Sequence, residues 1–322
     1  KERIAHDIMG WYLCHYHERE TALLALYPFR LSFYRRMGFG YGTPMHRFLL
    51  RPESFPRGER SHGARFLHET DREETIACYE RVMERTHGMF RKTPRERRQL
   101  TTAEERSVIG VQEGERLRGY LSFSFKERGS RHFLRHDLVI REWIHESTDA
   151  LRRLAGFLSV QADQVDRIVL HTQDDLLQHI LSDPVNDSGR MFLINHEIST
   201  RGLGILYRVI DVPRIFHQLR DHDFGGCSLK LKITLDDAFF PRNQGSTTLR
   251  FEEGKPVALD REGDADVEIA LDVGDFSSLL LGVIPFRKLH GYGLARISDP
   301  AQVGLIERLF AATEKPVCTT AF

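Results

Sequence analysis

The stretch FYRRMGF, Phe33 to Phe39, decides the fold of the opening part of this chain. It follows a short apolar run, Ala22 to Tyr27, that ends at Pro28. A run of this length and character is typical of a buried parallel strand, and Pro28 weakens regular pairing because it has no backbone N–H. Ser32 can cap a short helix, and Gly38 can end it. The sequence therefore predicts a buried strand that leads into a short helix ended by glycine.

A longer helix is predicted before this strand. Ile4, Ile8, Trp11 and Tyr12 fall at near-helical spacing. After the motif, residues 39–50 are expected to be extended. The order helix, strand, short helix, strand is typical of an α/β fold. It begins in mid-fold, because a lone strand needs earlier strands as partners.

A linker and a second α/β unit follow. Residues 51–64 are rich in proline, glycine and charge, as linkers are. The unit over 65–222 is predicted to contain a helix, a hairpin, a strand, a helix, a strand and a short helix. Its strand-to-helix junction, Arg141 to Ser147, contains no glycine. Side chains at this junction would keep a pyrophosphate away from the backbone amides.

Residues 223–322 are predicted to form an α+β unit with an antiparallel sheet. The stretches Leu229 to Leu235 and Val267 to Val273 alternate between apolar and polar residues, as half-buried strands do. Helices are expected around Asp275–Leu281 and Ala301–Phe310. The predicted fold class is therefore α/β followed by α+β.

Composition limits the classes of function. Lys+Arg and Asp+Glu both total 46, so the net charge is zero and no global basic field argues for nucleic acid or an anionic membrane. No apolar run approaches the roughly 20 residues that span a bilayer. The four cysteines form no CxxC pair, which is typical of reduced thiols in a cytoplasmic protein. The histidines have no Cys or carboxylate partners at ligand spacing, so no metal site is predicted.

The longer stretch YPFRLSFYRRMGFGYG, Tyr27 to Gly42, resembles the GNAT superfamily of acetyltransferases, and the Eis (enhanced intracellular survival) family in particular. The resemblance implies tandem GNAT-like domains and then a sterol-carrier-protein-like domain. The first GNAT domain is partial, with its cofactor-binding start cut short, and the second is degenerate. The implied division is a catalytic part, a linker, the degenerate domain and the terminal domain, over residues 1–50, 51–64, 65–222 and 223–322.

The same resemblance implies the activity. Members of the family are acetyl-CoA-dependent N-acetyltransferases whose acceptors are amines, such as aminoglycosides, polyamines or lysine side chains. They form homo-oligomeric rings, so a hexamer is expected for this chain. The implied reaction is direct attack of the amine on the thioester.

The resemblance also assigns site residues. The tyrosine of the motif, here Tyr34, is the family's general acid, because a phenol near the sulfur can donate to the developing thiolate. The C-terminal segment returns to the active site in this family, so the carboxylate of Phe322 is the expected base. A glycine-rich loop at the first helix holds the pyrophosphate through backbone amides. That loop corresponds to Arg3, Ile4 and Ala5, and Arg3 stands where the family has glycine.

Two other functions stay open. One is a non-catalytic protein that binds an apolar ligand in its third unit and uses the GNAT units as scaffold. The arginine at position 3 favours this alternative, and the intact motif around Tyr34 argues against it. The other is a structural or partner-binding α/β protein, which a lack of acetyl-CoA binding would favour. An isolated tyrosine would be a helix anchor, but the flanking motif favours a catalytic role for Tyr34. A chain end is usually solvated, but the family resemblance favours a catalytic role for Phe322.

Overall fold

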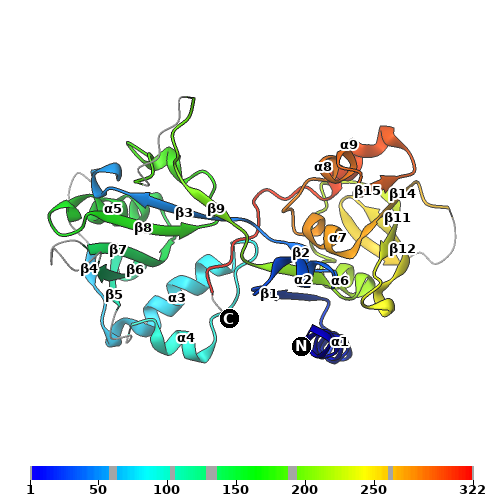
Figure 1. Ribbon diagram of the computed structural model, residues 1–322, viewed down its shortest axis with the longest axis horizontal. Helices are drawn as coiled ribbons and strands as arrows, with labels where there is room; N and C mark the ends of the chain where they lie inside the picture. The colour runs from blue at the N-terminus through cyan, green and yellow to red at the C-terminus, as the bar shows by residue number, and fades with distance from the viewer. Residues whose placement is uncertain are drawn as a thin grey trace. The chain divides into compact units, whose positions relative to one another are not determined.

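The computed structural model describes residues 2–57, 64–101, 106–127, 136–187, 194–259 and 264–320. These residues fall into two compact units. Unit 1 comprises residues 2–43 and 203–316, and unit 2 comprises residues 44–202 and 317–320. Each unit therefore combines segments that are far apart in the sequence, as the colours in Figure 1 show.

A three-stranded antiparallel sheet forms the first part of unit 1. Its strands lie in the order β1-β10-β2. Their bounds are β1 (Leu23–Leu26), β2 (Gly40–Tyr41) and β10 (Leu206–Val209). The sequence predicted that β1 would be a parallel strand, but its partner in the structure is the antiparallel β10. An apolar run predicts a strand, and it contains no information about the direction of a partner far along the chain.

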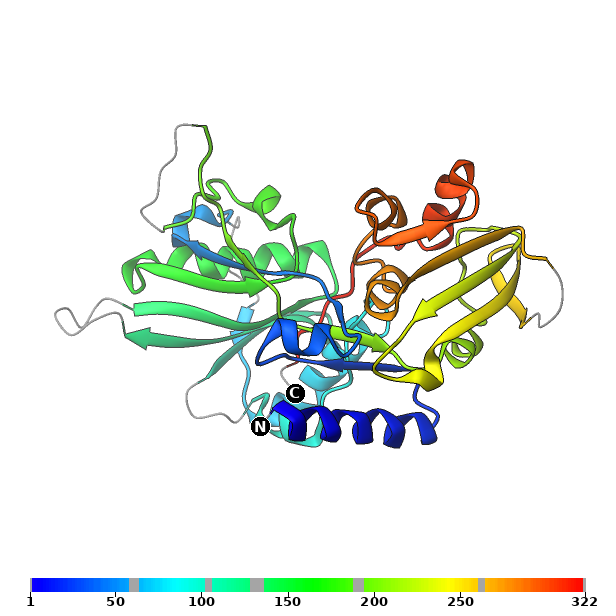
Figure 2. The ribbon, with the colours of Figure 1, turned by 45° about the vertical axis from the view of Figure 1, so that its right-hand side comes forward.

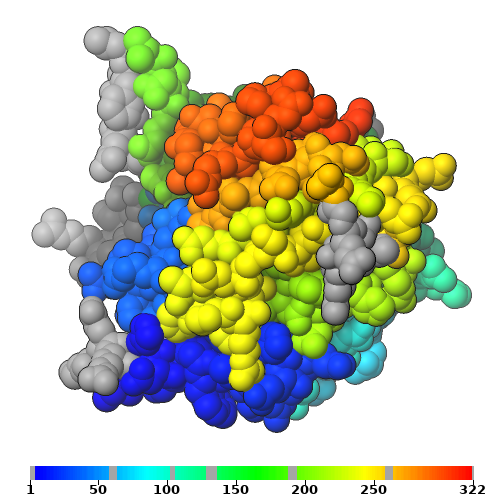
Figure 3. Space-filling model, turned by 90° about the vertical axis from the view of Figure 1, so that its right-hand side faces the viewer, coloured from blue at the N-terminus to red at the C-terminus, as the bar shows by residue number. Residues whose placement is uncertain are grey.

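Two helices pack on this small sheet, α1 (Glu2–Glu18) and α2 (Leu31–Arg35). Their apolar cluster joins α1, β1, α2 and β10, and its buried members include Leu13, Leu24, Phe33, Phe39 and Leu206. Two rings of α1 also contact the segment after β11: the centroids of His6 and Phe239 are 4.7 Å apart, and those of His17 and Phe240 are 5.7 Å apart. Figure 3 shows the blue helix α1 beside this yellow segment.

A five-stranded sheet forms the rest of unit 1. Its strands lie in the order β13-β12-β11-β14-β15. Their bounds are β11 (Leu229–Asp236), β12 (Gly245–Glu252), β13 (Lys255–Leu259), β14 (Val267–Asp272) and β15 (Ala295–Ile297). The sequence predicted an antiparallel sheet, but β11 and β14 pair in parallel. Alternation shows which face of a strand is buried, and it does not show the direction of its neighbour.

One face of this sheet is covered by four helices. They are α6 (Val212–Gln218), α7 (Val273–Leu280), α8 (Phe286–Gly291) and α9 (Val303–Leu309). Apolar side chains from all four helices and from alternate positions of β11 share one core cluster, in which Phe216, Phe276 and Phe286 are fully buried. The helices at α7 and α9 were predicted, whereas α6 and α8 were missed.

A seven-stranded sheet forms unit 2, in the order β4-β5-β6-β7-β8-β3-β9. Its strands are β3 (Met45–Leu50), β4 (Ala64–Phe66), β5 (Ser107–Glu113), β6 (Arg116–Glu127), β7 (His136–His145), β8 (Arg167–Thr172) and β9 (Thr200–Gly202). Strands β7 and β8 pair in parallel, and the parallel register ends at Ile140 and Leu170. The other neighbours in this sheet pair antiparallel.

Helices cover both faces of this sheet (Figure 2). The helices are α3 (Arg72–Met83), α4 (Pro94–Gln99) and α5 (Thr148–Ser159). Val108 packs in the cluster of α3, whereas its neighbour Ile109 packs in the cluster of α5. Tyr120 and Leu121 divide in the same way. Because side chains alternate along a strand, α3 and α5 lie on opposite faces.

The borders of the two units differ from the domain borders that the sequence predicted. Residues 39–50 contribute β2 to unit 1 and β3 to unit 2. Residues 203–222, which the sequence analysis grouped with the second unit, contribute β10 and α6 to unit 1. The segment expected as a linker begins with a 3-10 helix, Pro52–Ser54, in which two of the three residues are buried, and residues 58–63 lie outside the described residues. Composition marks turns, and it does not show which sheet a strand joins.

In the described parts of the chain, no helix combines the length and the apolar character that a membrane crossing requires.

A buried ion pair fixes β10 within unit 1. Both carboxylate oxygens of Asp237 accept hydrogen bonds from Nη2 of Arg208, at 2.7 and 2.8 Å. The two side chains are 0% and 1% exposed. Asp237 also accepts a hydrogen bond from the backbone N–H of Phe240 at 3.0 Å. Removing one partner would leave the other charge uncompensated in the core.

We predict that Asp237→Ala destabilises unit 1 by about 3–5 kcal/mol. Hydrogen exchange of the β10 and β11 amides measures the loss. Glu268→Ala is the matched control: Glu268 pairs with Lys232 across the same sheet at 3.1 Å, but their side chains are 49% and 35% exposed. Such a pair contributes about 1 kcal/mol or less. Equal losses in the two variants would contradict the prediction.

Candidate active site

The motif Phe33 to Phe39 forms α2 and the turn that ends it. The N–H of Gly38 donates to the carbonyl of Arg35 at 3.1 Å, and the N–H of Phe39 donates to the carbonyl of Tyr34 at 3.2 Å. This pair of bonds, with Gly38 at φ +78°, closes the helix as a Schellman turn. The predicted glycine at the helix end is therefore confirmed, whereas α2 begins at Leu31 and the residue before it, Arg30, has no capping side chain.

Two glycines, one in the motif and one directly after it, are needed for close packing. A Cβ at Gly38 would lie 1.7 Å from Nη1 of the buried Arg208. A Cβ at Gly40 would lie 2.0 Å from the carbonyl oxygen of Gly274, in α7. Both distances are far below any van der Waals contact. Only glycine at these two positions lets the motif pack against β10 and α7.

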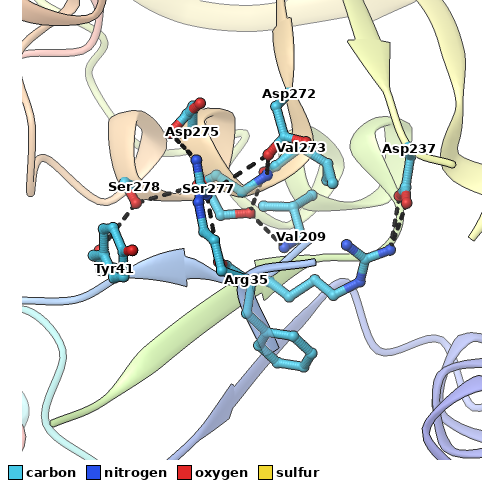
Figure 4. Close-up of polar contacts among 12 residues, drawn as sticks. Arg35, Tyr41, Val209, Asp237, Asp272, Val273, Asp275, Ser277 and Ser278 are labelled. Carbon is cyan, nitrogen blue, oxygen red and sulfur yellow. Dashed lines mark hydrogen bonds and ion pairs between the residues drawn. The ribbon is translucent and has the colours of Figure 1, made fainter. Parts of the chain in front are cut away.

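Arg35 binds the motif to the start of α7 (Figure 4). Its Nη2 donates to the carboxylate of Asp275, and its Nη1 lies 3.6 Å from Oδ1 of Asp272. The guanidinium also lies over the ring of Tyr41, 5.4 Å from the centroid. Burial raises the pKa of the Asp275 carboxyl, and the charge of Arg35 opposes this rise. The hydroxyl of Ser278 donates to the carbonyl of Tyr41 at 2.9 Å, so α7 holds both ends of the turn.

Tyr34 sits within a group of aromatic rings. Its ring makes edge-to-face contacts with Phe29, Phe33 and Phe39, with centroids 5.4, 5.2 and 5.9 Å away. Its side chain is half-buried, and burial raises the pKa of its hydroxyl above the usual value of 10.0. Within the described residues the hydroxyl has no hydrogen-bond partner. It is therefore protonated at neutral pH and free to donate.

The structure brings some of the predicted site residues together. Ala5, in the first turns of α1, and Tyr34 both pack on the same apolar cluster. Ile4 is 64% exposed and does not join that cluster. The side chain of Arg3 and all of Phe322 lie outside the described residues. The described part of the C-terminal segment, residues 317–320, packs within unit 2.

The strand-to-helix junction of unit 2 differs chemically from a phosphate site. The N–H of Ala150, in the first turn of α5, donates to Oγ of Ser147 at 3.1 Å. That hydroxyl donates in turn to the carboxylate of Glu113 at 2.8 Å. The carboxylate of Glu146 also lies at this helix start, where Arg81 and Arg118 bind it. A helix N-terminus that is capped by a side chain and flanked by two carboxylates disfavours a pyrophosphate.

Sequence reasoning missed the partners of the motif. Arg208, Asp237 and Asp275 lie some 170 to 240 residues further along the chain, as the contacts of Gly38 and Arg35 show. No spacing rule connects positions so far apart. One local signal for Asp237 existed. The alternating stretch Leu229 to Leu235 predicts a strand, and Asp236 and Asp237 follow it directly. A carboxylate at the end of a buried strand needs a partner.

Two domain families match this sequence. The acetyltransferase (GNAT) domain matches residues 82–203, and the sterol carrier protein domain matches residues 212–319. No curated protein matches the chain. The matched GNAT residues lie in unit 2, and the matched sterol carrier residues lie almost wholly in unit 1.

Solved structures share the fold of nearly the whole chain. A GCN5-related N-acetyltransferase from Anabaena variabilis is 19% identical, with a TM-score of 0.80 over 99% of this chain and 77% of that one. A probable N-acyltransferase from Enterococcus faecalis is 17% identical, with a TM-score of 0.76 over 98% and 76%. Eis1 from Mycobacterium abscessus is 19% identical, with a TM-score of 0.73 over 97% and 76%.

These similarities confirm the predicted fold class and resemblance. The chain contains a GNAT domain and a sterol-carrier-protein-like domain, and its fold is that of GNAT proteins that include an Eis protein. The matched GNAT domain supports the class that the sequence predicted, an N-acetyltransferase. The motif with Tyr34 lies before the matched residues, so its role depends on its own geometry.

We predict that Gly38→Ala destabilises unit 1 by at least about 2 kcal/mol, because it strains a left-handed position and displaces the guanidinium of Arg208. Hydrogen exchange of the α2 and α7 amides measures this loss. Gly10→Ala is the matched control, since a Cβ there meets no atom within 4 Å in the middle of α1. It should stabilise α1 by about 0.5–1 kcal/mol. A neutral Gly38→Ala would contradict the close packing.

Proposed function

We propose that this chain is an acetyl-CoA-dependent N-acetyltransferase that transfers the acetyl group directly to an amine, with Tyr34 as the acid. The single observation that carries the proposal is the setting of Tyr34. Its hydroxyl is half-buried, protonated and unpartnered among the described residues, on a turn that two glycines and Arg35 fix in place. The GNAT domain supplies the reaction class.

The chemistry requires a donor at the sulfur. The amine nitrogen attacks the thioester carbonyl, the carbon–sulfur bond breaks, and the CoA thiolate leaves. The thiol of CoA has a pKa of roughly 8.5, as for cysteine, which is below the raised pKa of Tyr34. Complete proton transfer from Tyr34 to the thiolate is therefore uphill. The main contribution of the phenol is a hydrogen bond that strengthens as charge develops on sulfur.

The site for the phosphates of acetyl-CoA is assigned to the start of α1. We infer, on the resemblance to the GNAT superfamily, that the backbone around Arg3, Ile4 and Ala5 borders the pyrophosphate. The shared cluster of Ala5 and Tyr34 supports a single site along α1 and α2. The capped junction at Ser147 supports the same choice, because it argues against a second phosphate site in unit 2.

The base is assigned to the main-chain carboxylate of Phe322, on the resemblance to the Eis family. It would accept the proton of the attacking amine, directly or through water. The acceptor class is an amine of a small molecule, such as an aminoglycoside or a polyamine, or of a lysine side chain. A cytoplasmic homohexamer is proposed on the same resemblance.

A second candidate function is binding of an apolar ligand in the sterol-carrier-like part, with the rest as scaffold. The observation that favours it is a cavity of about 250 Å³ between α6 and the strands β12 and β13. It is lined by Pro213, Phe216, His217, Arg220, Leu249, Pro256 and Val257. Failure of the chain to bind acetyl-CoA, together with binding of a fluorescent fatty acid, would favour this function.

We predict that Tyr34→Phe lowers kcat for CoA release by about 10²-fold or more. A thiol-detection assay with acetyl-CoA and a panel of polyamines, aminoglycosides and lysine peptides measures it. The matched control is Tyr292→Phe, which removes the hydroxyl of a tyrosine that is 67% exposed. Because burial raises the pKa of Tyr34, ionisation of this group should reduce turnover only above pH 10. Wild-type activity in Tyr34→Phe would exclude Tyr34 as the acid.

The base assignment predicts that one residue added after Phe322 lowers kcat by about 10²-fold, because it moves the carboxylate away from the amine. The same assay measures it, beside a variant in which the last residue is Leu instead of Phe. That variant keeps the carboxylate in place and should retain most of the activity. Equal turnover of the extended and wild-type chains would show that another group accepts the proton.

A further inference from the structure

The C-terminal segment changes unit at its last residues. The chain belongs to unit 1 up to Pro316 and to unit 2 from Val317. From there burial alternates: Cys318 and Thr320 are buried, at 3% exposure each, and Thr319 between them is exposed. Such alternation is typical of an extended segment with one face packed against protein. The segment Val317 to Thr320 is therefore a docked element rather than a frayed end.

Unit 2 contacts this segment from two elements. The N–H of Val317 donates to the carbonyl of His87, in the loop after α3, at 2.8 Å. The N–H of Cys318 donates to the side-chain Oε1 of Gln173, directly after β8, at 2.5 Å. Gln173 is buried, with only 6% of the residue exposed. On the α3 side, Oη of Tyr79 lies 3.5 Å from Oγ1 of Thr319.

The segment Val317 to Thr320 lies at the position where an open α/β sheet binds a ligand. Strands β7 and β8 are the parallel pair of this sheet, and Gln173 lies three residues past Leu170, the last residue of β8 that pairs with β7. In such sheets, ligands bind outside the carboxyl ends of the parallel strands. On the other side of the docked segment, the ammonium of Lys92 lies over the ring of Tyr79, 4.2 Å from its centroid. The same ammonium donates to the carboxylate of Glu142, near the carboxyl end of β7, at 2.7 Å. The chain's own C-terminal segment thus occupies this position.

We propose that unit 2 serves as an anchor for the C-terminal segment, and that Gln173 is the positioning residue that holds it. The consequence for catalysis depends on the proposed function, in which the carboxylate of Phe322 is the base. Two residues of chain span at most about 7 Å. The hydrogen bond from Cys318 to Gln173 and the burial of Thr320 therefore limit how far the terminal carboxylate can move.

Thiol accessibility tests the anchor without any need for activity. Cys318 is a buried, reduced cysteine in the segment, and Cys78 is a buried, reduced cysteine on α3, within the core of unit 2. Burial raises the pKa of the Cys78 thiol to about 12, which further slows its reaction in the folded unit. Alkylation of Cys318 by iodoacetamide, mapped by mass spectrometry in the full chain, reports undocking. Alkylation of Cys78 reports unfolding of unit 2.

Gln173→Met removes the acceptor oxygen and keeps the length of the side chain. We expect alkylation of Cys318 to accelerate at least about fivefold, as for the loss of one buried hydrogen bond, with Cys78 unchanged. Gln173→Ala should give a larger effect. Gln164→Met, at an exposed glutamine of the same unit, is the matched control and should behave as wild type. An unchanged rate at Cys318 in Gln173→Met would overturn the anchor.

Turnover then tests the connection to catalysis. In the CoA-release assay, Gln173→Met should lower kcat and leave KM for acetyl-CoA unchanged, because the donor site lies in unit 1. Faster alkylation with unchanged kcat would overturn Gln173 as a positioning residue for the base. If the wild-type chain releases no CoA, the proposed function fails, while the alkylation rates still decide whether the segment is anchored.

Discussion

The burial of one charge, the guanidinium of Arg208, constrains most of unit 1. A charge without access to water requires a partner, and Asp237 provides both oxygens. The guanidinium also requires room, and Gly38 leaves that room because it has no side chain. The strand β10, the segment after β11 and the turn at Gly38 therefore all pack around the guanidinium of Arg208. Arg35 extends this network to α7 through Asp275, so the catalytic candidate and the sterol-carrier-like part fold as one body within unit 1.

This interleaving explains which features the sequence could predict. The strand before the motif, the helix at α2 and the glycine that ends it follow from residues next to one another, and the resemblance around Tyr34 points to the same stretch. The pairing of β1 with β10, of β11 with β14 and of Arg35 with Asp275 joins positions far apart. Alternation and apolar runs encode which side of an element is buried. The partner and its direction depend on the summed packing of the whole unit, which no local pattern contains.

The second unit shows how a fold can keep its architecture while its chemistry changes. The parallel strands β7 and β8, with the helix α5 between them in the chain, have the arrangement that binds phosphates in open α/β sheets. Here Ser147 and Glu113 use the helix start for capping, and a negative charge stands where an anion would bind. The core remains intact on both faces of the sheet, because α3 and α5 bury separate clusters against alternate side chains. Packing therefore preserves this unit independently of any ligand.

A unit whose core is packed on both faces of its sheet is well suited to hold a peptide at the ends of its parallel strands. Holding a chain end in place is an entropic task, since each ordered residue loses roughly 1–2 kcal/mol of backbone freedom. Two hydrogen bonds and the burial of alternate side chains offset that loss over Val317 to Thr320. A base supplied by a chain terminus has little rigidity of its own, so its effective concentration at the reacting amine depends on such an anchor. The docked segment in unit 2 and the proposed base at Phe322 are then connected by one physical requirement, a fixed position for the last residues.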